Sequence, residues 1–591
     1  MTAENAGLLP MMRRRSDLPP AEPQPWSELI PTDSFYARLA KWRDVLVDDE
    51  DYTPLYKDSP RGRPSIPPSM VVLAMLLEYH DDCSDAEAEQ RMRFDLRWKH
   101  ALGMGLEDEG FDATVLCRFR RKLLECGLER ALFERLVNAA REVGLITRDA
   151  VQLIDSSHIL GAAGARDTYA LIRGGIRKLL GALGYTPTRR AELGERLSWY
   201  LDPGAPEKPQ NIDWGDAEAR AAHLKEIVED ARAALSLEGN ATTPASSEAA
   251  ALLEKIVSDD VQEGPPPPPK QKGRPPKKKE KNTDRSAAQQ QDRSSPEDRA
   301  PRLRQGVAKD RVLSVVDPQM RVGHKSKRQS WAGYKVHLCE EPHSELITQV
   351  GVRPANEYDA DAAADLLKRQ QDSVRLRPKG LLCDGAYGSA DVRAELGKLG
   401  VEVVAKLRPL TDSKHFRKDE FEIDLLANEG EGSVRCPAGV TTTDFRMARD
   451  GWYRPVKLFR FPKEVCEKCE LKELCLGGPN GRVKHPVRVP PGRQVQLHYH
   501  EGVLQRARAE QRTEEQQKAL RERLRPRAKV ERKISETLRL HGLRQGRYFG
   551  LEKTDLQALM TATMVNTKRL FTLTADKDAA LTEALREELA A

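Results

Sequence analysis

The chain has 591 residues, of which 39% are hydrophobic and 32% are charged. This length is too great for one ordinary hydrophobic core, so we expect three or four domains. No apolar stretch approaches the length of a membrane span, and the first basic residues follow a short apolar piece, the reverse of a secretory signal. These features argue against a membrane protein and predict a cytoplasmic one.

The net charge of +6 is concentrated in one segment. Residues 270–285 hold eight Lys or Arg against two acidic residues, an excess equal to that of the whole chain. We expect the proline-rich residues 262–308 to be a basic, disordered linker in which Lys272 and Arg274 bind DNA by neutralising phosphates. The Gly-Arg-Pro core around Arg274 resembles an AT-hook. The alternative is a solvated tail that only aids solubility.

The N-terminal quarter of the chain predicts a helical domain. Residues 1–35 are polar and punctuated by proline, which indicates a disordered start. Residues 36–145 show helical spacing of apolar residues, and we interpret them as a helical DNA-binding domain. Its helix over 112–126 resembles the reader of a helix-turn-helix unit, although an ordinary charged helix face is the alternative. The candidate DNA contacts on this helix are Arg118, Arg121 and Lys122, with Arg120 also expected on its surface.

A strand-like pattern begins at Ala150 and returns later in the chain. The run over 150–160 predicts a strand that contains Asp155, and residues 161–261 predict a helical insertion. Further strands are expected over 310–320, 333–341, 346–354, 380–383 and 401–409, with a helix over 359–371. An α/β sheet of this order resembles an RNase H-like core, which we assign to residues 146–160, 309–410 and 511–572. Residues 573–591 are left as a C-terminal helix or tail.

Two aspartates lie in or directly after predicted strands. Asp384 follows a short apolar strand, at the sheet edge where ligands and chemistry collect in open α/β sheets. Together with Asp155 and one further carboxylate, it would hold two Mg²⁺ or Mn²⁺ ions, which clamp the oxygens of a phosphodiester. Gly385 and Gly388 would then let a DNA backbone approach closely. The alternative is a turn aspartate that accepts hydrogen bonds from its own backbone.

A helix predicted to begin near Pro526 supplies the third carboxylate. Its apolar stripe consists of Val530, Ile534 and Leu538. An advance of about 100° per residue puts Glu531 at the border of this stripe and Glu536 on the solvent side. We therefore favour Glu531, with Arg527 one turn earlier on the same face and also a candidate DNA contact. A plain Arg–Glu helix pair is the alternative.

The nine cysteines divide into a cluster and isolated residues. An odd number in a reducing compartment argues against a simple disulfide framework. The spacing within residues 411–510 resembles a four-cysteine zinc site in a small lobe, with reduced free thiols as the alternative. The candidate zinc ligands are Cys436, Cys466, Cys469 and Cys475. The cysteines expected in apolar cores are Cys83, Cys117, Cys126, Cys339 and Cys383.

Three residues near the predicted strands have weaker assignments. Lys335 belongs to a basic cluster with Lys325, Lys327 and Arg328 and is a candidate DNA contact, unless this is only a solvated face. His337 ends a strand, where a structural histidine is the simpler interpretation. Tyr387 is expected to pack beneath the strand that precedes Asp384.

Several of these motifs occur together in one known family. The chain resembles the DDE transposases of bacterial insertion sequences through "LIDSSHI", "LLCDGAYGS" and "VERKISETLRLHGLRQGRYFGLEK", and through residues 62–79, 314–337, 352–363 and 556–570. The resemblance spans most of residues 60–572. It implies an RNase H-like fold and a catalytic triad of Asp155, Asp384 and Glu531. The tyrosine often found three residues before the arginine of this family is replaced here by Leu524.

The resemblance implies a function and its partners. A transposase would bind the terminal inverted repeats of its own element, cleave one DNA strand with metal-activated water, and transfer the freed 3′-hydroxyl to other DNA. We expect double-stranded DNA as substrate, a homodimer on DNA, two Mg²⁺ or Mn²⁺ ions per active site, one structural zinc and a nucleoid-associated location. The alternatives are a catalytically inactive, transposase-derived DNA-binding regulator and a stand-alone nuclease.

Overall fold

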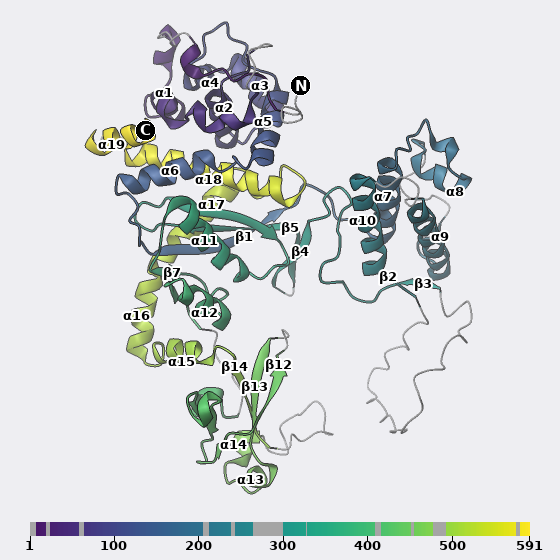
Figure 1. Ribbon diagram of the computed structural model, residues 1–591, viewed down its shortest axis with the longest axis vertical. Coiled ribbons are helices and arrows are strands. Elements are labelled where there is room, and N and C mark those ends of the chain that lie inside the picture. The colour runs from purple at the N-terminus through teal and green to yellow at the C-terminus, as the bar shows by residue number, and fades with distance from the viewer. Residues whose placement is uncertain are drawn as a thin grey trace.

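The computed structural model describes residues 8–18, 24–57, 64–204, 212–237, 243–263, 300–326, 328–407, 415–450, 454–476, 492–574 and 579–590. Helices from both ends of the chain lie over a mixed sheet, a helical arm stands to one side, and a β-rich lobe hangs below (Figure 1). Within the described part, no helix is both long and apolar enough to cross a membrane.

The N-terminal region is helical, as predicted. Its helices are α1 (Phe35–Leu46), α2 (Pro68–His80), α3 (Asp85–Phe94), α4 (Leu96–Leu102), α5 (Ala113–Cys126) and α6 (Ala131–Glu142). Helix α2 is almost wholly buried because the C-terminal helices α18 (Leu551–Leu573) and α19 (Ala579–Ala590) pack around the same bundle. Apolar residues of this bundle and of the sheet form one continuous core, so residue 145 does not separate two cores.

The prediction of a disordered start over residues 1–35 is wrong for the described residues. Leu9 pairs with Leu55 and Lys57 through backbone hydrogen bonds of 3.0 Å. Arg15 donates to the carbonyl oxygen of Leu102 at 2.7 Å, and residues Pro25–Leu29 form a 3₁₀-helix. Composition suggested disorder, but these contacts with the helical bundle order the segment.

The central sheet contains β1 (Gln152–Leu160), β4 (Arg321–Ser326), β5 (Gln329–Glu340), β6 (Ile347–Pro354), β7 (Gly380–Leu382) and β8 (Glu402–Val404). Its order is β4-β5-β1-β7-β8, with β6 beside β5. Strand β1 is antiparallel to β5, with Asp155 opposite Leu338, and parallel to β7. A mixed α/β architecture with an N-terminal helical region is therefore confirmed.

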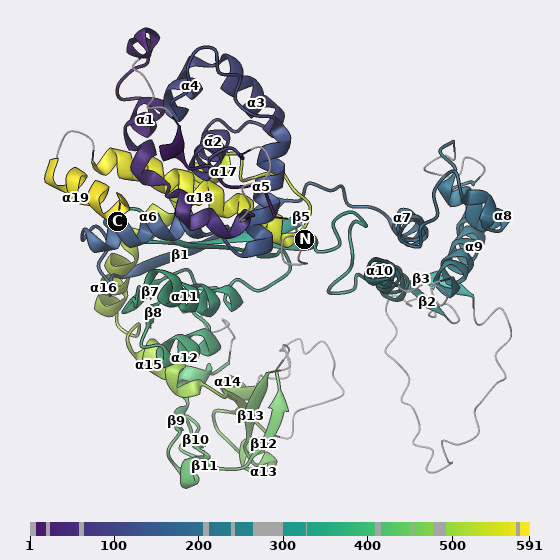
Figure 2. The same ribbon diagram turned by 45° about the horizontal axis from the view of Figure 1, so that its top comes forward.

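Helices cover both faces of this sheet (Figure 2). Alternate residues of β1 point to opposite faces, so Leu153 joins the core under α17 (Ala528–Leu540) and α18. Ile154 joins a second core with α11 (Asp361–Val374) and α12 (Ala390–Lys398). Asp155 has the same parity as Leu153, and its side chain therefore belongs to the face that α17 covers.

The predicted strand over residues 310–320 is wrong. This segment forms turns, and strand β4 begins only at Arg321. Val312 packs into the core of the helical arm, and Arg311 donates to Asp260 at 2.7 Å. The apolar residues that suggested a strand therefore join the arm to the body of the protein.

The arm agrees with the predicted helical insertion. It consists of α7 (Thr168–Ala182), α8 (Glu195–Ser198), α9 (Ala217–Ser236) and α10 (Pro244–Asp260), with its own apolar core. Strand β2 (Val261–Glu263) pairs with β3 (Pro301–Leu303), so both ends of the predicted linker over 262–308 form a short ribbon. Lys272 and Arg274 lie outside the described residues.

The β-rich lobe has two small sheets. They comprise β9 (Glu422–Asp424), β10 (Ser433–Arg435) and β11 (Thr441–Thr442), and β12 (Phe445–Arg449), β13 (Pro455–Arg460) and β14 (Gln494–His498). Two short helices, α13 (Lys463–Glu467) and α14 (Lys472–Leu476), follow β13. Helices α15 (Glu501–Ala509) and α16 (Glu514–Leu524) then return the chain to α17. Six apolar residues form the buried core of this lobe.

Candidate active site

Asp155 lies in the middle of the sheet, on β1. One oxygen of its carboxylate accepts a hydrogen bond from the backbone N–H of Ser156 at 2.8 Å. Burial raises the pKa of Asp155 to about 6, and the nearby carboxylates of Asp384 and Glu531 act in the same direction. The Ser156 N–H and the Arg527 guanidinium oppose this rise. The structure therefore brings Asp384 and Glu531 within electrostatic reach of Asp155.

Asp384 follows β7, as the sequence predicts. Its Oδ1 accepts hydrogen bonds from the backbone N–H groups of Ala386 at 2.8 Å and Tyr387 at 3.4 Å. The turn interpretation is thus correct for one oxygen, and Oδ2 is left for other partners. Tyr387 is fully buried, and its hydroxyl lies 2.8 Å from Nδ1 of His337, so both residues pack beneath the site.

Gly385 and Gly388 have a packing reason besides the expected approach of a DNA backbone. A Cβ atom at Gly385 would lie 3.2 Å from the carbonyl oxygen of Lys406, and one at Gly388 would lie 3.0 Å from Cβ of Ala405. Both glycines are therefore explained by tight packing against the segment after β8. Buried Arg393 fastens the same segment, because it donates to the carbonyl oxygens of Gly388, Val403 and Ala405. No motif in the sequence indicated these contacts of Arg393.

Glu531 lies in the first turn of α17. Its Oε1 is 2.8 Å from Nη2 of Arg527, which is also 3.9 Å from Oδ2 of Asp155. One guanidinium nitrogen therefore lies within 4 Å of both the first and the third carboxylate. The α-helix begins at Ala528, after a 3₁₀ turn over Arg525–Arg527, slightly later than predicted. Val530, Ile534 and Leu538 are buried, as the stripe requires.

Glu536 does not face solvent, which corrects the helical-wheel interpretation. Its side chain is 25% exposed, whereas that of Glu531 is 55% exposed. Glu536 lies between Lys533 at 3.3 Å and Lys568 of α18 at 3.2 Å. Both ion pairs lower the pKa of its carboxyl group against the effect of burial. Glu536 therefore ties α17 to α18, and Glu531 is the carboxylate that faces Asp155.

The three carboxylates suit a hard divalent cation in their donor chemistry. Among the residues that the structure describes, however, no group of three or more His, Cys, Asp or Glu side chains is arranged to hold a metal ion. The Arg527 guanidinium lies between Asp155 and Glu531 and supplies positive charge there. A cation that bridges these two carboxylates would have to displace it.

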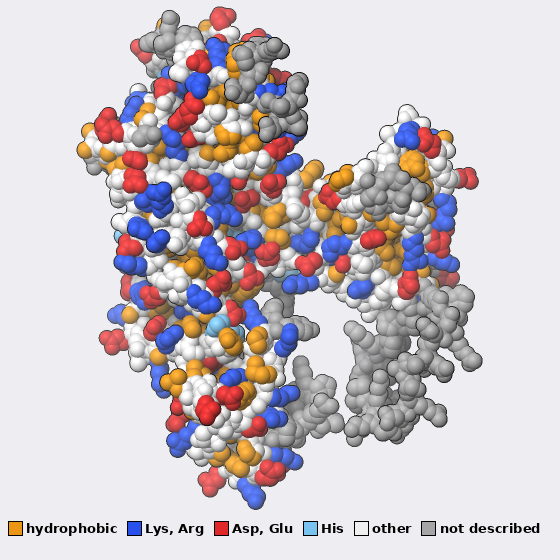
Figure 3. Space-filling view, viewed as in Figure 1, with side chains coloured by type: hydrophobic (Ala, Val, Ile, Leu, Met, Phe, Trp, Pro, Cys, Tyr) orange, Lys and Arg blue, Asp and Glu red, His pale blue; other side chains and the backbone are white. Residues whose placement is uncertain are grey.

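The candidate DNA contacts have different environments. Arg118 and Arg121 are exposed on α5, whereas Lys122 pairs with Glu125. The expectation that Arg120 lies on the surface is wrong, because it is buried and pairs with Glu78 and Asp85. Basic and acidic side chains are interspersed over the face in Figure 3, with no single large basic patch.

Lys335 is also poorly placed for DNA. Its side chain is 12% exposed, and its ammonium lies 2.6 Å from Asp359 and donates to the carbonyl oxygen of Glu357 at 2.8 Å. These contacts account for its charge and correct its assignment as a DNA contact. The pair fastens β5 to the segment before α11.

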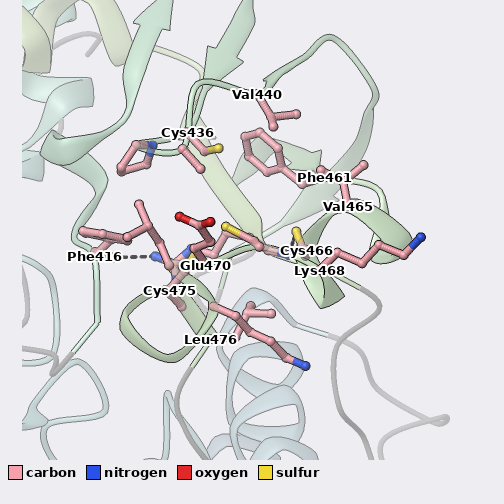
Figure 4. A pocket seen from close by; sticks show the side chains of 16 residues that line it. Phe416, Cys436, Val440, Phe461, Val465, Cys466, Lys468, Glu470, Cys475 and Leu476 are labelled. Atoms are coloured by element: carbon pink, nitrogen blue, oxygen red, sulfur yellow. Dashed lines mark hydrogen bonds between the residues drawn. The ribbon is translucent and has the colours of Figure 1, made fainter.

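The four candidate zinc ligands line one pocket in the lobe, of about 480 Å³. Figure 4 shows Cys436, Cys466 and Cys475 around it. All nine cysteines are free, and the backbone N–H of Arg493 donates to Sγ of Cys466 at 3.5 Å. Burial raises the pKa of the Cys475 thiol, and the other three cysteines of the cluster add to this. Of the expected core cysteines, Cys117 is exposed and Cys126 half-buried, while Cys83, Cys339 and Cys383 are buried.

Two stretches of the chain match known families. Residues 24–122 match a transposase domain (DUF772), and residues 435–571 match a transposase DDE domain. The resemblance to an insertion-sequence DDE transposase is confirmed. Searches of curated proteins and of solved structures found no match.

The two matched ranges divide the site. Glu531, Arg527 and the four clustered cysteines fall within the DDE match, whereas Asp155 and Asp384 lie outside both matches. A DDE domain implies an RNase H-like fold, and the mixed sheet around β1 agrees with this. Transposase domains also imply DNA as partner. The assignment of the two aspartates rests on the geometry around Asp155.

Proposed function

We propose that this protein cleaves DNA at the ends of its own element and joins the freed 3′-hydroxyl to other DNA. The observation that carries the proposal is the position of Asp155, half-buried and within electrostatic reach of Asp384, Glu531 and the Arg527 guanidinium. Carboxylates gathered in this way repel one another, and a bound cation relieves the repulsion. A purely structural role for the three carboxylates has less support.

Asp155, Asp384 and Glu531 are the residues that would hold two Mg²⁺ or Mn²⁺ ions. Such ions activate water and stabilise the charge that develops on a phosphodiester. The fold holds the three carboxylates in fixed positions. Strand β1 is paired on both sides, and the Asp384 turn is fixed by its own backbone N–H groups. Helix α17 is attached to α18 through the ion pair of Glu536 with Lys568. In-line positioning and charge neutralisation carry most of the catalysis in such transfers.

The proposed DNA interface combines Arg118, Arg121 and Lys122 of α5 with the basic segment around Lys272 and Arg274. Arg118 and Arg121 support it best, because their side chains are exposed on a helix whose opposite face is packed. We propose that these residues hold the terminal inverted repeats through phosphate contacts. Joining two ends requires two active sites, which favours a homodimer on DNA.

The test of this function is cleavage of a plasmid that carries the gene's own flanking DNA. The wild-type protein is expected to cut at the element ends with Mg²⁺ and to lose this activity when the metal is chelated. Specific binding without cleavage would favour the inactive regulator. Cutting without any preference for the ends would favour a stand-alone nuclease.

The cysteine pocket supports a second proposal, a structural zinc bound by Cys436, Cys466, Cys469 and Cys475. Four thiols line one small cavity, and the lobe has only a small apolar core to hold it together. Thiolate is the ligand that structural zinc prefers, and such sites contribute folding energy to lobes of this kind. The sulfurs would have to draw closer than they lie here to complete the tetrahedron.

We expect about one zinc per chain in the purified protein, measured by elemental analysis. Cys466→Ser should lose the metal and lower the melting temperature of the lobe. Cys117→Ser, which changes an exposed cysteine on α5, should change neither. A metal-free wild-type protein with the same melting temperature as Cys466→Ser would refute the zinc site.

A further inference from the structure

A second cleft lies beside the candidate active site. It has a volume of about 750 Å³ and is lined by residues from several parts of the chain. Gly385 and Ser389 come from the loop that begins at Asp384, and Tyr358 comes from the segment before α11. Arg454 and His498 come from the β-rich lobe, and Lys309 comes from the segment between β3 and β4. The cleft is therefore formed where the core and the lobe meet.

The walls of the cleft are fastened to each other. The Tyr358 hydroxyl donates to the carbonyl oxygen of Ala386 at 2.9 Å, which ties one wall to the Asp384 loop. Arg454 lies 2.9 Å from Asp391, in the first turn of α12, which ties the lobe to the core. A ligand in the cleft would thus lie directly against the loop that carries Asp384.

The size of the cleft limits what it can accept. A volume of this order suits a ligand of drug size. One or two unpaired nucleotides fit such a space, whereas a duplex does not. The cleft lies next to Asp384, a carboxylate that we assign to phosphodiester cleavage. A nucleotide of the DNA end is therefore the ligand that we expect there.

The residues that line the cleft suit both the phosphate and the base of a nucleotide. Lys309 lines the cleft together with Arg454 and Arg508, which are ion-paired with Asp391 and Glu501, so a bound phosphate would share their guanidinium groups with these carboxylates. Glu357 and the side-chain oxygen of Asn356 supply acceptors for base edges, since the Asn356 amide nitrogen already donates to Lys309 and Asp310. A lining that carries acidic groups favours a base over a purely phosphate-binding groove. The Tyr358 side chain is 36% exposed and offers a ring on which a base can stack.

We propose that this cleft binds unpaired nucleotides of the DNA end, beside the phosphate that Asp155, Asp384 and Glu531 act on. This inference rests on the proposed function, because it takes the ligand from that reaction. The lobe then has a role in holding the substrate, with Arg454 on one side of the strand and Tyr358 on the other.

The test compares binding of two DNA probes to the full-length protein by fluorescence anisotropy. One probe is a duplex with a short single-stranded tail, and the other is the same duplex with a blunt end. The wild type should bind the tailed probe about tenfold more tightly, the effect of one stacked base with its phosphate. Tyr358→Ala and the double variant Lys309→Gln/Arg454→Gln should both lose this preference.

Two control variants separate nucleotide binding from loop fastening. Tyr358→Phe keeps the ring but loses the hydrogen bond to Ala386, and it should keep the preference. Arg435→Gln changes an exposed arginine of β10 in the same lobe and should also keep it. Equal binding of both probes by the wild type, or an unchanged preference in Tyr358→Ala and the double variant, would overturn the assignment. Metal-dependent cleavage at element ends in that case would leave the proposed function standing.

Discussion

Glu531→Gln is expected to lower metal-dependent strand cleavage about a thousandfold or more, because a lost metal ligand removes several kcal/mol of transition-state stabilisation. Glutamine keeps the length of the side chain and an oxygen for Arg527, so α17 should fold as before. Cleavage of the plasmid with the gene's own flanking DNA measures the effect, and DNA binding should change little.

The matched control is Glu536→Gln, one and a half turns further along the same helix. Its two carboxylate oxygens accept hydrogen bonds from Lys533 and Lys568 separately, so the single carboxamide oxygen of glutamine keeps one of these bonds and loses the other. This variant should retain cleavage, with some loss of stability. Wild-type cleavage by Glu531→Gln, or loss of cleavage in Glu536→Gln alone, would exclude Glu531 as the third ligand.

Asp384→Asn extends the same test to the sheet. Asparagine retains an Oδ1 that accepts from the Ala386 N–H, so the turn should persist while a charged metal ligand is lost. We expect cleavage to fall as far as in Glu531→Gln and DNA binding to remain. Cleavage at the wild-type level by Asp384→Asn would remove Asp384 from the triad.

Periodicity within single elements was a reliable guide to this fold. The stripe of Val530, Ile534 and Leu538 is buried, and the strands that carry Asp155 and precede Asp384 lie next to each other. The buried stripe depends on the spacing of apolar residues along one element, and this spacing is visible in the sequence. The same rule was wrong for the carboxylates beside the stripe, because Glu531 is 55% exposed and Glu536 is 25% exposed.

Contacts between distant elements were not predictable in this way. A helical wheel places Glu536 in solvent because it cannot include Lys568, which α18 brings in from 32 residues further along the chain. Likewise, Lys335 forms an ion pair with Asp359, and the backbone after β8 packs against Gly385 and Gly388. Each error concerns a partner that only the tertiary structure supplies.

Arg120 gives the clearest example, and it leads to the largest stability effect that we expect. Its guanidinium is buried between Glu78 of α2, at 3.0 Å, and Asp85 of α3. Arg547, from the loop after α17, reaches the other oxygen of Glu78 at 2.9 Å. This buried network joins the N-terminal helices to the chain segment that follows the Glu531 helix.

Arg120→Leu should destabilise the helical region by about 3–5 kcal/mol, because it leaves the buried carboxylate of Glu78 with one cationic partner fewer. Hydrogen exchange of the α2 amides in the full-length protein measures the free energy of opening of this region directly. The neighbouring Arg121→Leu is the control, and it should change that free energy by less than about 0.5 kcal/mol, since its side chain is exposed.

The same two variants separate folding from DNA binding on α5. If Arg121 contacts a phosphate, Arg121→Leu should weaken DNA binding. It should also reduce the slope of the logarithm of the binding constant against the logarithm of salt concentration by about one, while leaving hydrogen exchange unchanged. Arg120→Leu should do the reverse at a temperature where the helices remain folded. A loss of less than about 1 kcal/mol in Arg120→Leu would mean that Glu78 is already neutralised by Arg547 alone. Arg120 would then be a local contact of α5, and the joint between the two ends of the chain would depend on Arg547.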